Sequence, residues 1–348
     1  MTHDRPSLAA LLAAVPLPAL LIDAGERIVA ANAEARALLG PQIEARHFAT
    51  ILRQPPVVQA IEGVLETGTA REAAYLASAA AQDTSYTVSC RPAPGPGGAR
   101  GVLVSFQDVT HVEQAGQMRR DFVANVSHEL RTPLTAMMGF IETLRGPARD
   151  DTQARARFLD IMEGEANRMN RLIGDLLSLS RVEAEERVRP TDRVDLAAQL
   201  RSTLHSLTPL AEDADVRLLL SGAEAPAWMR GDPDQLQQVF TNLIENAIKY
   251  GGAGGCVRID LEERADDAAV RGPSVRVTVS DDGPGIDPVH LPRVTERFYR
   301  IDSHRSRALG GTGLGLAIVK HIVNRHRGRL RIDSASGQGA RFTVILPQ

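Results

Sequence analysis

Short apolar runs separated by turn residues mark the N-terminal third of the chain. Two such runs within residues 19–32 flank Ala24-Gly25 and predict a β-hairpin. Apolar and polar positions alternate over 86–90 with the period of a half-buried strand, and a turn rich in Pro and Gly leads into another strand at 101–106. With one short helix after the hairpin, the pattern predicts a small α/β module over residues 1–111.

The hydrophobic period changes to three or four residues from about residue 112. One stripe on a first helix contains Met118, Phe122, Val126, Leu130, Leu134, Met137, Ile141 and Leu144. Gly146-Pro147 ends this helix, and either Asp151 or Thr152 can cap a second one. The region 112–190 is therefore expected to form an antiparallel helical hairpin. Because one hairpin buries little apolar surface, we expect two chains to pair as a dimeric four-helix bundle.

Residues 191–348 return to strands, which alternate with amphipathic helices at 235–250 and 314–326. The strand candidates are 216–220, 257–261, 275–281, 329–333 and 341–347. This order predicts an α/β sandwich in which helices cover one face of a mixed sheet. The whole chain is expected to be a multidomain α+β protein with boundaries near residues 111 and 190.

The composition is typical of folded domains, and the net charge argues against a nucleic-acid partner. Hydrophobic residues make up 43% of the chain and charged residues 24%, which excludes disorder as its main state. A net charge of −3 gives no general attraction to nucleic acid, so no nucleic-acid partner is predicted. Two cysteines, Cys90 and Cys256, exclude a disulfide scaffold and fit a reducing compartment.

The most apolar window lies near the N-terminus, at residues 7–22. It is shorter than the roughly 20 apolar residues that a spanning helix needs, and it contains Pro16 and Pro18. We interpret it as a helix that leads into the first strand of a folded domain. We therefore expect a cytoplasmic protein with no evident transmembrane segment; peripheral attachment to a membrane surface is the alternative.

The first helix of the hairpin carries a candidate nucleophile. His128 lies two positions after the stripe residue Val126, about 200° around the helix, so its side chain should face solvent. A neutral imidazole held in this way can act as a nucleophile, and the adjacent Glu129 can accept its proton. Thr132 lies four residues after His128 on the same face, where its hydroxyl can position a water. An exposed histidine without a role is the alternative interpretation for His128 considered alone.

The helix at 235–250 has a polar face opposite its apolar face. This polar face consists of Asn242, Asn246, Lys249 and Tyr250. Two amides, an ammonium and an aromatic ring can together hold a cation, phosphates and a base, and Mg²⁺ prefers oxygen ligands that include phosphate oxygens. An ordinary solvated helix face is the alternative for this feature taken alone.

Two glycine-rich segments accompany this helix. Their glycines are Gly283 and Gly285 in the first segment and Gly311, Gly313 and Gly315 in the second. The first segment follows Asp281 at a strand end, where the backbone can approach a ligand and the carboxylate can accept a hydrogen bond from an amine. The second precedes the helix at 314–326 and offers backbone N–H groups to an anion. The arginine-rich segment 286–312 predicts a lid over phosphates.

In this order, the motifs resemble those of sensor histidine kinases. NVSHELRTPLT resembles the phospho-acceptor box, NLIENAIKY the N box, DDGPGI the first glycine box, ERFYRID the F box and GGTGLGLAIVKHIV the second glycine box. These motifs cover residues 118–348, and the part from ERFYRID onward is most similar to the phosphate-regulon sensor kinases. Residues 1–111 resemble a PAS domain that ends in the D-x-T of Asp108 and Thr110.

The resemblance implies ATP and Mg²⁺ as cofactors and a Bergerat-type ATP-binding domain over 191–348. By this resemblance, Asn246 ligates Mg²⁺, and Asn242 and Lys249 lie at the phosphates. Tyr250 packs beside adenine, and Asp281 binds the adenine amine. Phe298 seats the lid, and the pocket and lid are shaped by Gly283, Gly285, Gly311, Gly313 and Gly315. His128 would take the γ-phosphoryl group with Glu129 as base. Thr132 would serve hydrolysis of a phospho-aspartate.

The implied activity is autophosphorylation on His128, followed by transfer to an aspartate of a response regulator. Phosphatase activity toward the phosphorylated regulator, homodimerisation through 112–190 and a role in the phosphate-starvation response are part of the same expectation. Two alternatives stay open. An ATPase of the gyrase type would share the nucleotide motifs without an acceptor box, and a phosphatase-biased scaffold would keep the fold.

Overall fold

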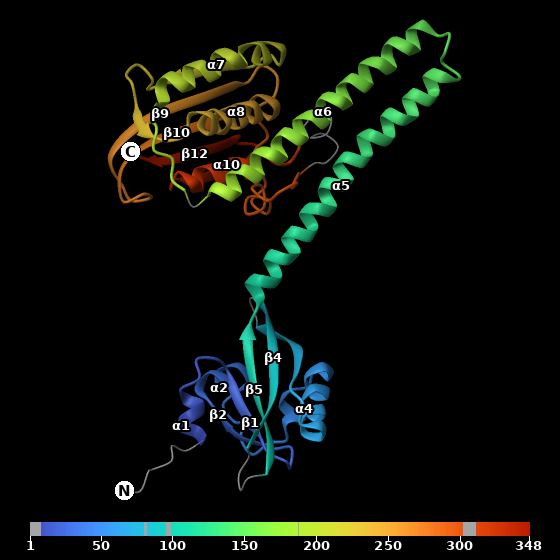
Figure 1. Cartoon of the computed structure of the whole chain (residues 1–348). Coiled ribbons are helices and arrows are strands. Elements are labelled where there is room, and N and C mark those ends of the chain that lie inside the picture. The colour runs from blue at the N-terminus through green and yellow to red at the C-terminus, as the bar shows by residue number, and fades with distance from the viewer. Residues whose placement is uncertain (1–7, 80–81, 95–98, 187, 302–310) are drawn as a thin grey trace. The chain divides into compact units, whose positions relative to one another are not determined.

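The computed structural model describes residues 8–79, 82–94, 99–186, 188–301 and 311–348. The chain divides into two compact units, Met1–Ala124 and Asn125–Gln348 (Figure 1). The helix α5, Thr110–Arg145, is continuous through the residues where one unit ends and the next begins.

The first unit is built on a five-stranded antiparallel sheet with the order β2-β1-β5-β4-β3. Its described strands are β1 (Ala19–Ile22), β2 (Ile28–Ala31), β3 (Arg71–Ala79), β4 (Gln82–Pro94) and β5 (Arg100–Asp108). Its helices before α5 are α1 (Leu8–Ala13), α2 (Ala33–Leu39), α3 (Phe48–Ile51) and α4 (Pro55–Thr67). The predicted hairpin is present, because β1 pairs with β2 and Leu20 lies opposite Ala31.

Both faces of this sheet are covered to some extent. The main core lies on the face that α4 covers, where Phe48, Ile61 and Phe106 are fully buried. A smaller cluster joins Leu12 of α1 to Leu21 of β1, and within the described residues 8–22 a helix leads into the first strand, as the sequence predicts.

The helical hairpin consists of α5 and α6 (Thr152–Glu185), and both ends follow from the sequence. The helix α5 ends at Arg145, before Gly146-Pro147, and the Asp151 side chain caps α6 by accepting hydrogen bonds from the N–H groups of Gln153 and Ala154. Long as these helices are, no helix in the described part of the chain combines the length and apolar content that crossing a membrane requires.

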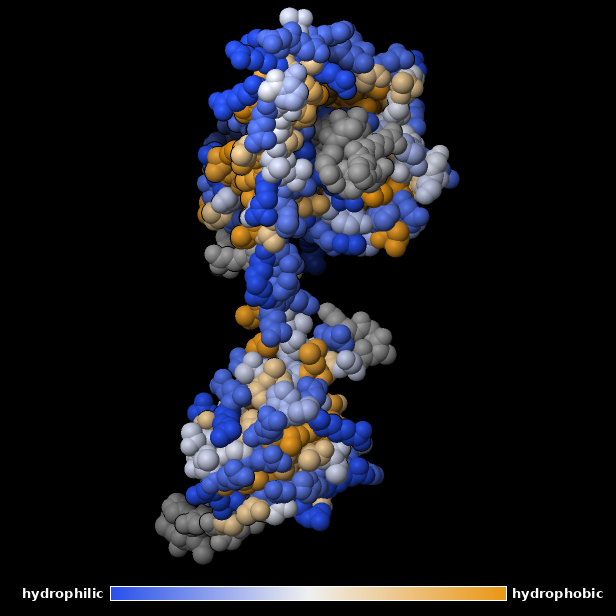
Figure 2. All heavy atoms as spheres, turned by 90° about the vertical axis from the view of Figure 1, so that its right-hand side faces the viewer, coloured by the Kyte–Doolittle hydropathy of each residue, from blue (hydrophilic) through white to orange (hydrophobic). Residues whose placement is uncertain are grey.

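The hairpin leaves part of its apolar stripe exposed in the single chain. Met118, Leu134 and Ile141 are 62%, 48% and 40% exposed. Hydrophobic residues also reach the surface among hydrophilic ones on the face of the molecule drawn in Figure 2. Exposed stripe residues are what helices show when their packing partner is another chain.

The C-terminal part of the second unit is a sheet with helices on one face (Figure 1). The order is β11-β12-β10-β9-β7, with β7 parallel to β9 and the other neighbours antiparallel. Its strands are β7 (Arg217–Ser221), β9 (Cys256–Asp267), β10 (Gly272–Ser280), β11 (Arg329–Ser334) and β12 (Ala340–Pro347). The covering helices are α7 (Leu196–Asp213), α8 (Pro233–Tyr250) and α10 (Gly315–Arg325). The expected multidomain α+β architecture with an α/β sandwich is confirmed.

Some elements of the second unit are not evident in the sequence pattern. The strands β6 (Arg193–Asp195) and β8 (Trp228–Arg230) form a small antiparallel pair, and each has only three residues, too few to display a period. The helix α7 was not among the expected helices. It contains Pro209, which normally argues against a helix interior.

Candidate functional site

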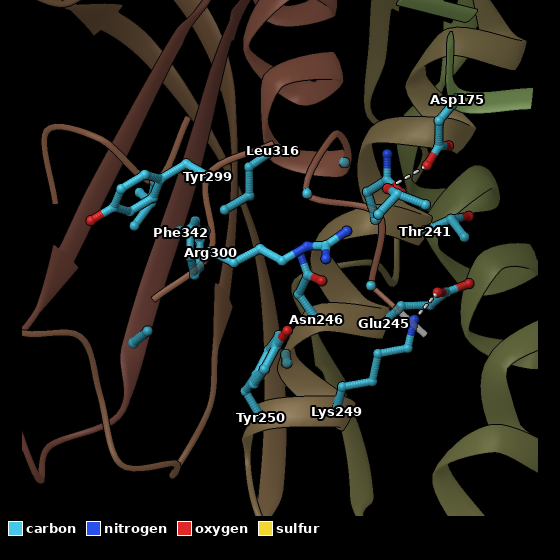
Figure 3. A pocket seen from close by; sticks show the side chains of 18 of the residues that line it. Asp175, Thr241, Glu245, Asn246, Lys249, Tyr250, Tyr299, Arg300, Leu316 and Phe342 are labelled. Carbon is cyan, nitrogen blue, oxygen red and sulfur yellow. Dashed lines mark hydrogen bonds and ion pairs between the residues drawn. The ribbon is translucent and has the colours of Figure 1, made fainter. Parts of the chain in front are cut away.

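A cavity of about 750 Å³ lies in the second unit, beside α8 (Figure 3). Its lining includes most of the residues that the motifs single out. These are Asn242, Asn246, Lys249, Tyr250, Asp281, Gly285, Gly311, Gly313 and Gly315. Three segments separated along the chain therefore meet at one concave surface, as binding sites for small molecules require.

The helix α8 brings its polar face to the cavity because its apolar face anchors it in the core. Leu236, Val239 and Leu243 are fully buried, and Asp232 caps the helix by accepting hydrogen bonds from two backbone N–H groups. On the cavity side, the Lys249 ammonium donates to the Glu245 carboxylate at 2.7 Å. The Asn242 Nδ2 group is buried and has no hydrogen-bond partner among the described residues. A buried amide of this kind is a donor for an incoming oxygen.

Asp281 directly follows β10 and is 9% exposed. Its Oδ1 accepts hydrogen bonds from the backbone N–H groups of Gly283 at 2.9 Å and Ala340 at 3.2 Å. Burial raises the pKa of this carboxyl, and the two backbone donors oppose the shift. Since both bonds go to Oδ1, the second oxygen is left for a ligand in the cavity.

Two glycines allow the backbone to wrap the cavity closely. Gly285 has φ +71° and Gly313 has φ +74°, conformations that side-chain-bearing residues rarely adopt. A Cβ at Gly313 would lie 2.9 Å from the Cα of Phe298, so these two loops touch through their backbones.

Two of the motif residues support the cavity without lining it. The Gly283 N–H donates to Asp281, and the Phe298 N–H donates to the Gly313 carbonyl at 2.8 Å. Both residues therefore hold cavity-lining residues in place. The expected lid over 286–312 lies only partly within the described residues, since 302–310 are outside them.

The cavity also contains residues that were not predicted individually as site residues. Arg171 and Asp175 of α6 line it, as do Arg300 and Thr312 from the segments on either side of 302–310. Thr312 donates a hydrogen bond from its hydroxyl to Asp175 Oδ2 at 2.6 Å. Burial raises the pKa of Asp175, and the bond from Thr312 opposes that shift. No local sequence pattern reports such contacts, because they join elements more than one hundred residues apart.

The acceptor segment lies on α5 and has its own contacts. His128 is exposed, as its position after Val126 predicts, and it is not among the residues that line the cavity. The Thr132 hydroxyl donates to the backbone carbonyl of His128 at 3.1 Å. Glu129 accepts a hydrogen bond from Arg168 of α6 at 2.8 Å.

Three family models match the chain in succession. A model described as PAS fold matches residues 12–114, one described as His Kinase A (phospho-acceptor) domain matches 118–185, and one described as Histidine kinase-, DNA gyrase B-, and HSP90-like ATPase matches 231–348. The acceptor model spans His128, and the ATPase model spans α8 and the cavity loops. The chain belongs to the sensor histidine kinases. The ATPase model implies that this kinase uses ATP.

Curated relatives agree with this family. The phosphate regulon sensor protein PhoR of Pseudomonas aeruginosa is 44% identical over 246 residues, which cover 71% of this chain and 54% of PhoR. The sensor histidine kinase WalK of Bacillus subtilis is 36% identical over 247 residues, which cover 71% of this chain and 39% of WalK. The chain thus spans about half or less of these relatives. The expected similarity to phosphate-regulon sensors is confirmed.

A solved structure shares the fold over nearly the full length. The crystal structure of histidine kinase ThkA in complex with the response regulator protein TrrA aligns with a TM-score of 0.52 and 21% identity, and covers 97% of both chains. At that identity, the match shows the fold alone.

Proposed function

We propose that this chain is an ATP-dependent protein-histidine kinase that phosphorylates itself on His128 and passes the group to an aspartate of a response regulator. The observation that carries this proposal is that a cavity of nucleotide size, whose lining includes amide, ammonium and carboxyl groups, and an exposed histidine with an adjacent carboxylate belong to one compact unit. An ATPase of the gyrase type would leave the acceptor hairpin without a use.

The cavity fits ATP in size and in the chemistry of its lining. Its volume of about 750 Å³ lies within the range of roughly 300–1,000 Å³ that small-molecule sites occupy. Asp281 can accept a hydrogen bond from the adenine amine, and Tyr250 can pack against the ring. The Asn242 Nδ2 group, for which the described residues offer no hydrogen-bond partner, can donate to a phosphate oxygen. Lys249 and the backbone N–H groups at Gly311, Gly313 and Gly315 can hold further phosphate oxygens.

Asn246 is the proposed ligand for Mg²⁺. Its amide oxygen is a hard donor of the type that Mg²⁺ accepts together with phosphate oxygens and water, and it lines the cavity beside Asn242. The ion, when bound, would neutralise phosphate charge.

Phosphoryl transfer depends mainly on positioning and charge neutralisation. An imidazole nitrogen of His128 attacks the γ-phosphorus in line, the bond to the ADP oxygen breaks, and Glu129 takes the imidazole proton. Since His128 does not line the cavity, the ATP-binding part has to move toward the acceptor helix before transfer. The phosphoryl group then leaves the histidine for the regulator's aspartate.

We assign one role to each of the three predicted domains. Residues 1–111 would sense the signal, 112–190 would dimerise and carry His128, and 191–348 would bind ATP. Homodimerisation is supported by the acceptor-domain match and by the exposed stripe on α5. The identity with PhoR favours a phosphate-responsive pathway, and ATP as donor favours a cytoplasmic site of action.

Thr132→Ala is expected to keep autophosphorylation and to lose most phosphatase activity toward the phosphorylated regulator. The hydroxyl lies one helical turn from His128, where it can position a water for attack on a phospho-aspartate. The measurement is the rate of regulator dephosphorylation, with label on His128 as the control. Equal phosphatase rates in the variant and the wild type would contradict this role.

Asn246→Asp is expected to weaken binding of magnesium-ATP by at least about tenfold, because a carboxylate beside the phosphates adds electrostatic repulsion. Titration of the variant with nucleotide and increasing Mg²⁺ checks this. Unchanged affinity and unchanged labelling would argue against Asn246 as the metal ligand.

A further inference from the structure

The carboxylate of Glu129 is held by two guanidinium groups from different parts of the second unit. Arg168 of α6 lies 2.8 Å from its Oε2, and Arg300 lies 3.2 Å from Oε2 and 3.4 Å from Oε1. The Arg300 side chain is 8% exposed, that of Arg168 is 12% and that of Glu129 is 26%. Ion pairs this poorly solvated are screened far less than surface pairs.

Arg300 belongs to the nucleotide cavity at the same time. It is one of the residues that line the cavity, and Figure 3 shows its side chain extended among the other lining residues. Its Nε is buried and has no hydrogen-bond partner among the described residues. The Arg300 guanidinium therefore contacts the carboxylate next to His128, while the same side chain lines the cavity.

A second contact joins the same two regions. The Thr312 hydroxyl donates to Asp175 of α6, and Thr312, Glu129, Pro133 and Arg168 line a small apolar recess between the helices and the cavity loop. The loop segments on either side of 302–310 are thus tied to the hairpin through Arg300 and Thr312.

The Glu129 carboxylate and the phosphates of a bound nucleotide would compete for Arg300, and their charges are unequal. Glu129 offers one negative charge that Arg168 already shares, whereas the triphosphate of ATP offers several negative charges inside the cavity. An arginine fork binds phosphate oxygens as readily as a carboxylate. A nucleotide in the cavity is therefore the stronger partner for Arg300.

We propose that Arg300 is a nucleotide-sensing positioning residue, which holds Glu129 while the cavity is empty and releases it when phosphates enter. Glu129 then becomes available to accept the proton of His128 only when ATP is bound. The consequence for proton transfer rests on the proposed kinase function, whereas the competition for Arg300 does not. Because such coupling is reciprocal, Glu129 must weaken nucleotide binding by the same factor by which nucleotide weakens the Glu129–Arg300 contact.

The test is a double-mutant cycle on the full chain, read as the affinity for the β,γ-imido analogue of ATP with magnesium chloride. Glu129 does not line the cavity, so Glu129→Gln can alter this affinity only through a residue that does. We expect Glu129→Gln to bind the analogue about 5- to 10-fold more tightly than the wild type. In the Arg300→Gln background, the same substitution should change the affinity by less than about twofold.

A matched control removes the same charge from the same helix. Glu142 lies on α5, is exposed and has no described contact with Arg300, so Glu142→Gln should leave the affinity within about twofold of the wild type. Thermal unfolding of each variant checks the fold. If Arg300→Gln fails to fold, Arg300→Lys replaces it in the cycle, and the smaller ammonium should reduce the coupling by at least about half.

The proposal is overturned if Glu129→Gln binds the analogue as the wild type does, or if it gains equally in both backgrounds. The binding cycle involves no phosphoryl transfer. A failure of the kinase function would appear instead as absence of label on His128, so the two failures are distinguishable.

Discussion

Replacing Asp281 with asparagine should lower the affinity for ATP by about 10- to 100-fold while the domain stays folded. A hydrogen bond to a charged group contributes about 1.5–3 kcal/mol, which corresponds to that range. In the variant, the amide oxygen can still accept the bonds from the Gly283 and Ala340 N–H groups. The amide NH₂ would then face the adenine amine, and two donors cannot bond to each other.

Base specificity supplies the control for this prediction. An inosine nucleotide carries a carbonyl oxygen where adenine carries its amine, and the asparagine NH₂ can donate to that oxygen. Asp281→Asn should therefore favour the inosine nucleotide relative to the wild type, as measured by competition binding. A variant that loses affinity for both nucleotides equally, or for neither, would contradict base recognition by Asp281.

Gly285→Ala should remove nucleotide binding and destabilise the second unit. The residue has φ +71°, which costs a residue with a side chain about 1–2 kcal/mol. A Cβ would in addition collide with the backbone carbonyl of Ala335, and such overpacking costs about 1–3 kcal/mol more. Relief of this clash would move the loop that carries Asp281. Thermal unfolding together with analogue binding measures both effects.

A control at the nearby Gly337 distinguishes the cost of the positive φ angle from the cost of the steric clash. It has φ +79°, but a Cβ there would have no heavy atom within 4 Å. Gly337→Ala should therefore lose only the conformational part, about 1–2 kcal/mol, and should retain nucleotide binding. If both variants lose the same stability and the same affinity, the close approach at Gly285 has no role in shaping the site.

Sequence patterns were sufficient to predict those parts of the fold that neighbouring residues in the sequence determine. The end of α5 follows from Gly146-Pro147, and the start of α6 follows from the Asp151 cap. The polar face of α8 could be predicted because helical spacing alone places Asn242 and Asn246 together, opposite a buried stripe.

The contacts that link the two halves of the second unit could not be predicted in this way. Arg300 stands 171 residues from Glu129, and Thr312 stands 137 residues from Asp175. Nothing in the period of either segment reports the other. For the same reason, the motifs identify Gly283 and Phe298 but do not show that these two residues support the cavity rather than line it.

The most direct test of the central claim is incubation of the full chain with Mg²⁺ and ATP labelled in its γ-phosphate. Wild type, His128→Gln and the control His205→Gln, which alters another exposed helical histidine, are compared. We predict label that is labile in acid and stable in base on the wild type and on His205→Gln, and none on His128→Gln. Label retained by His128→Gln, or steady ATP hydrolysis with no labelled protein, would contradict the account.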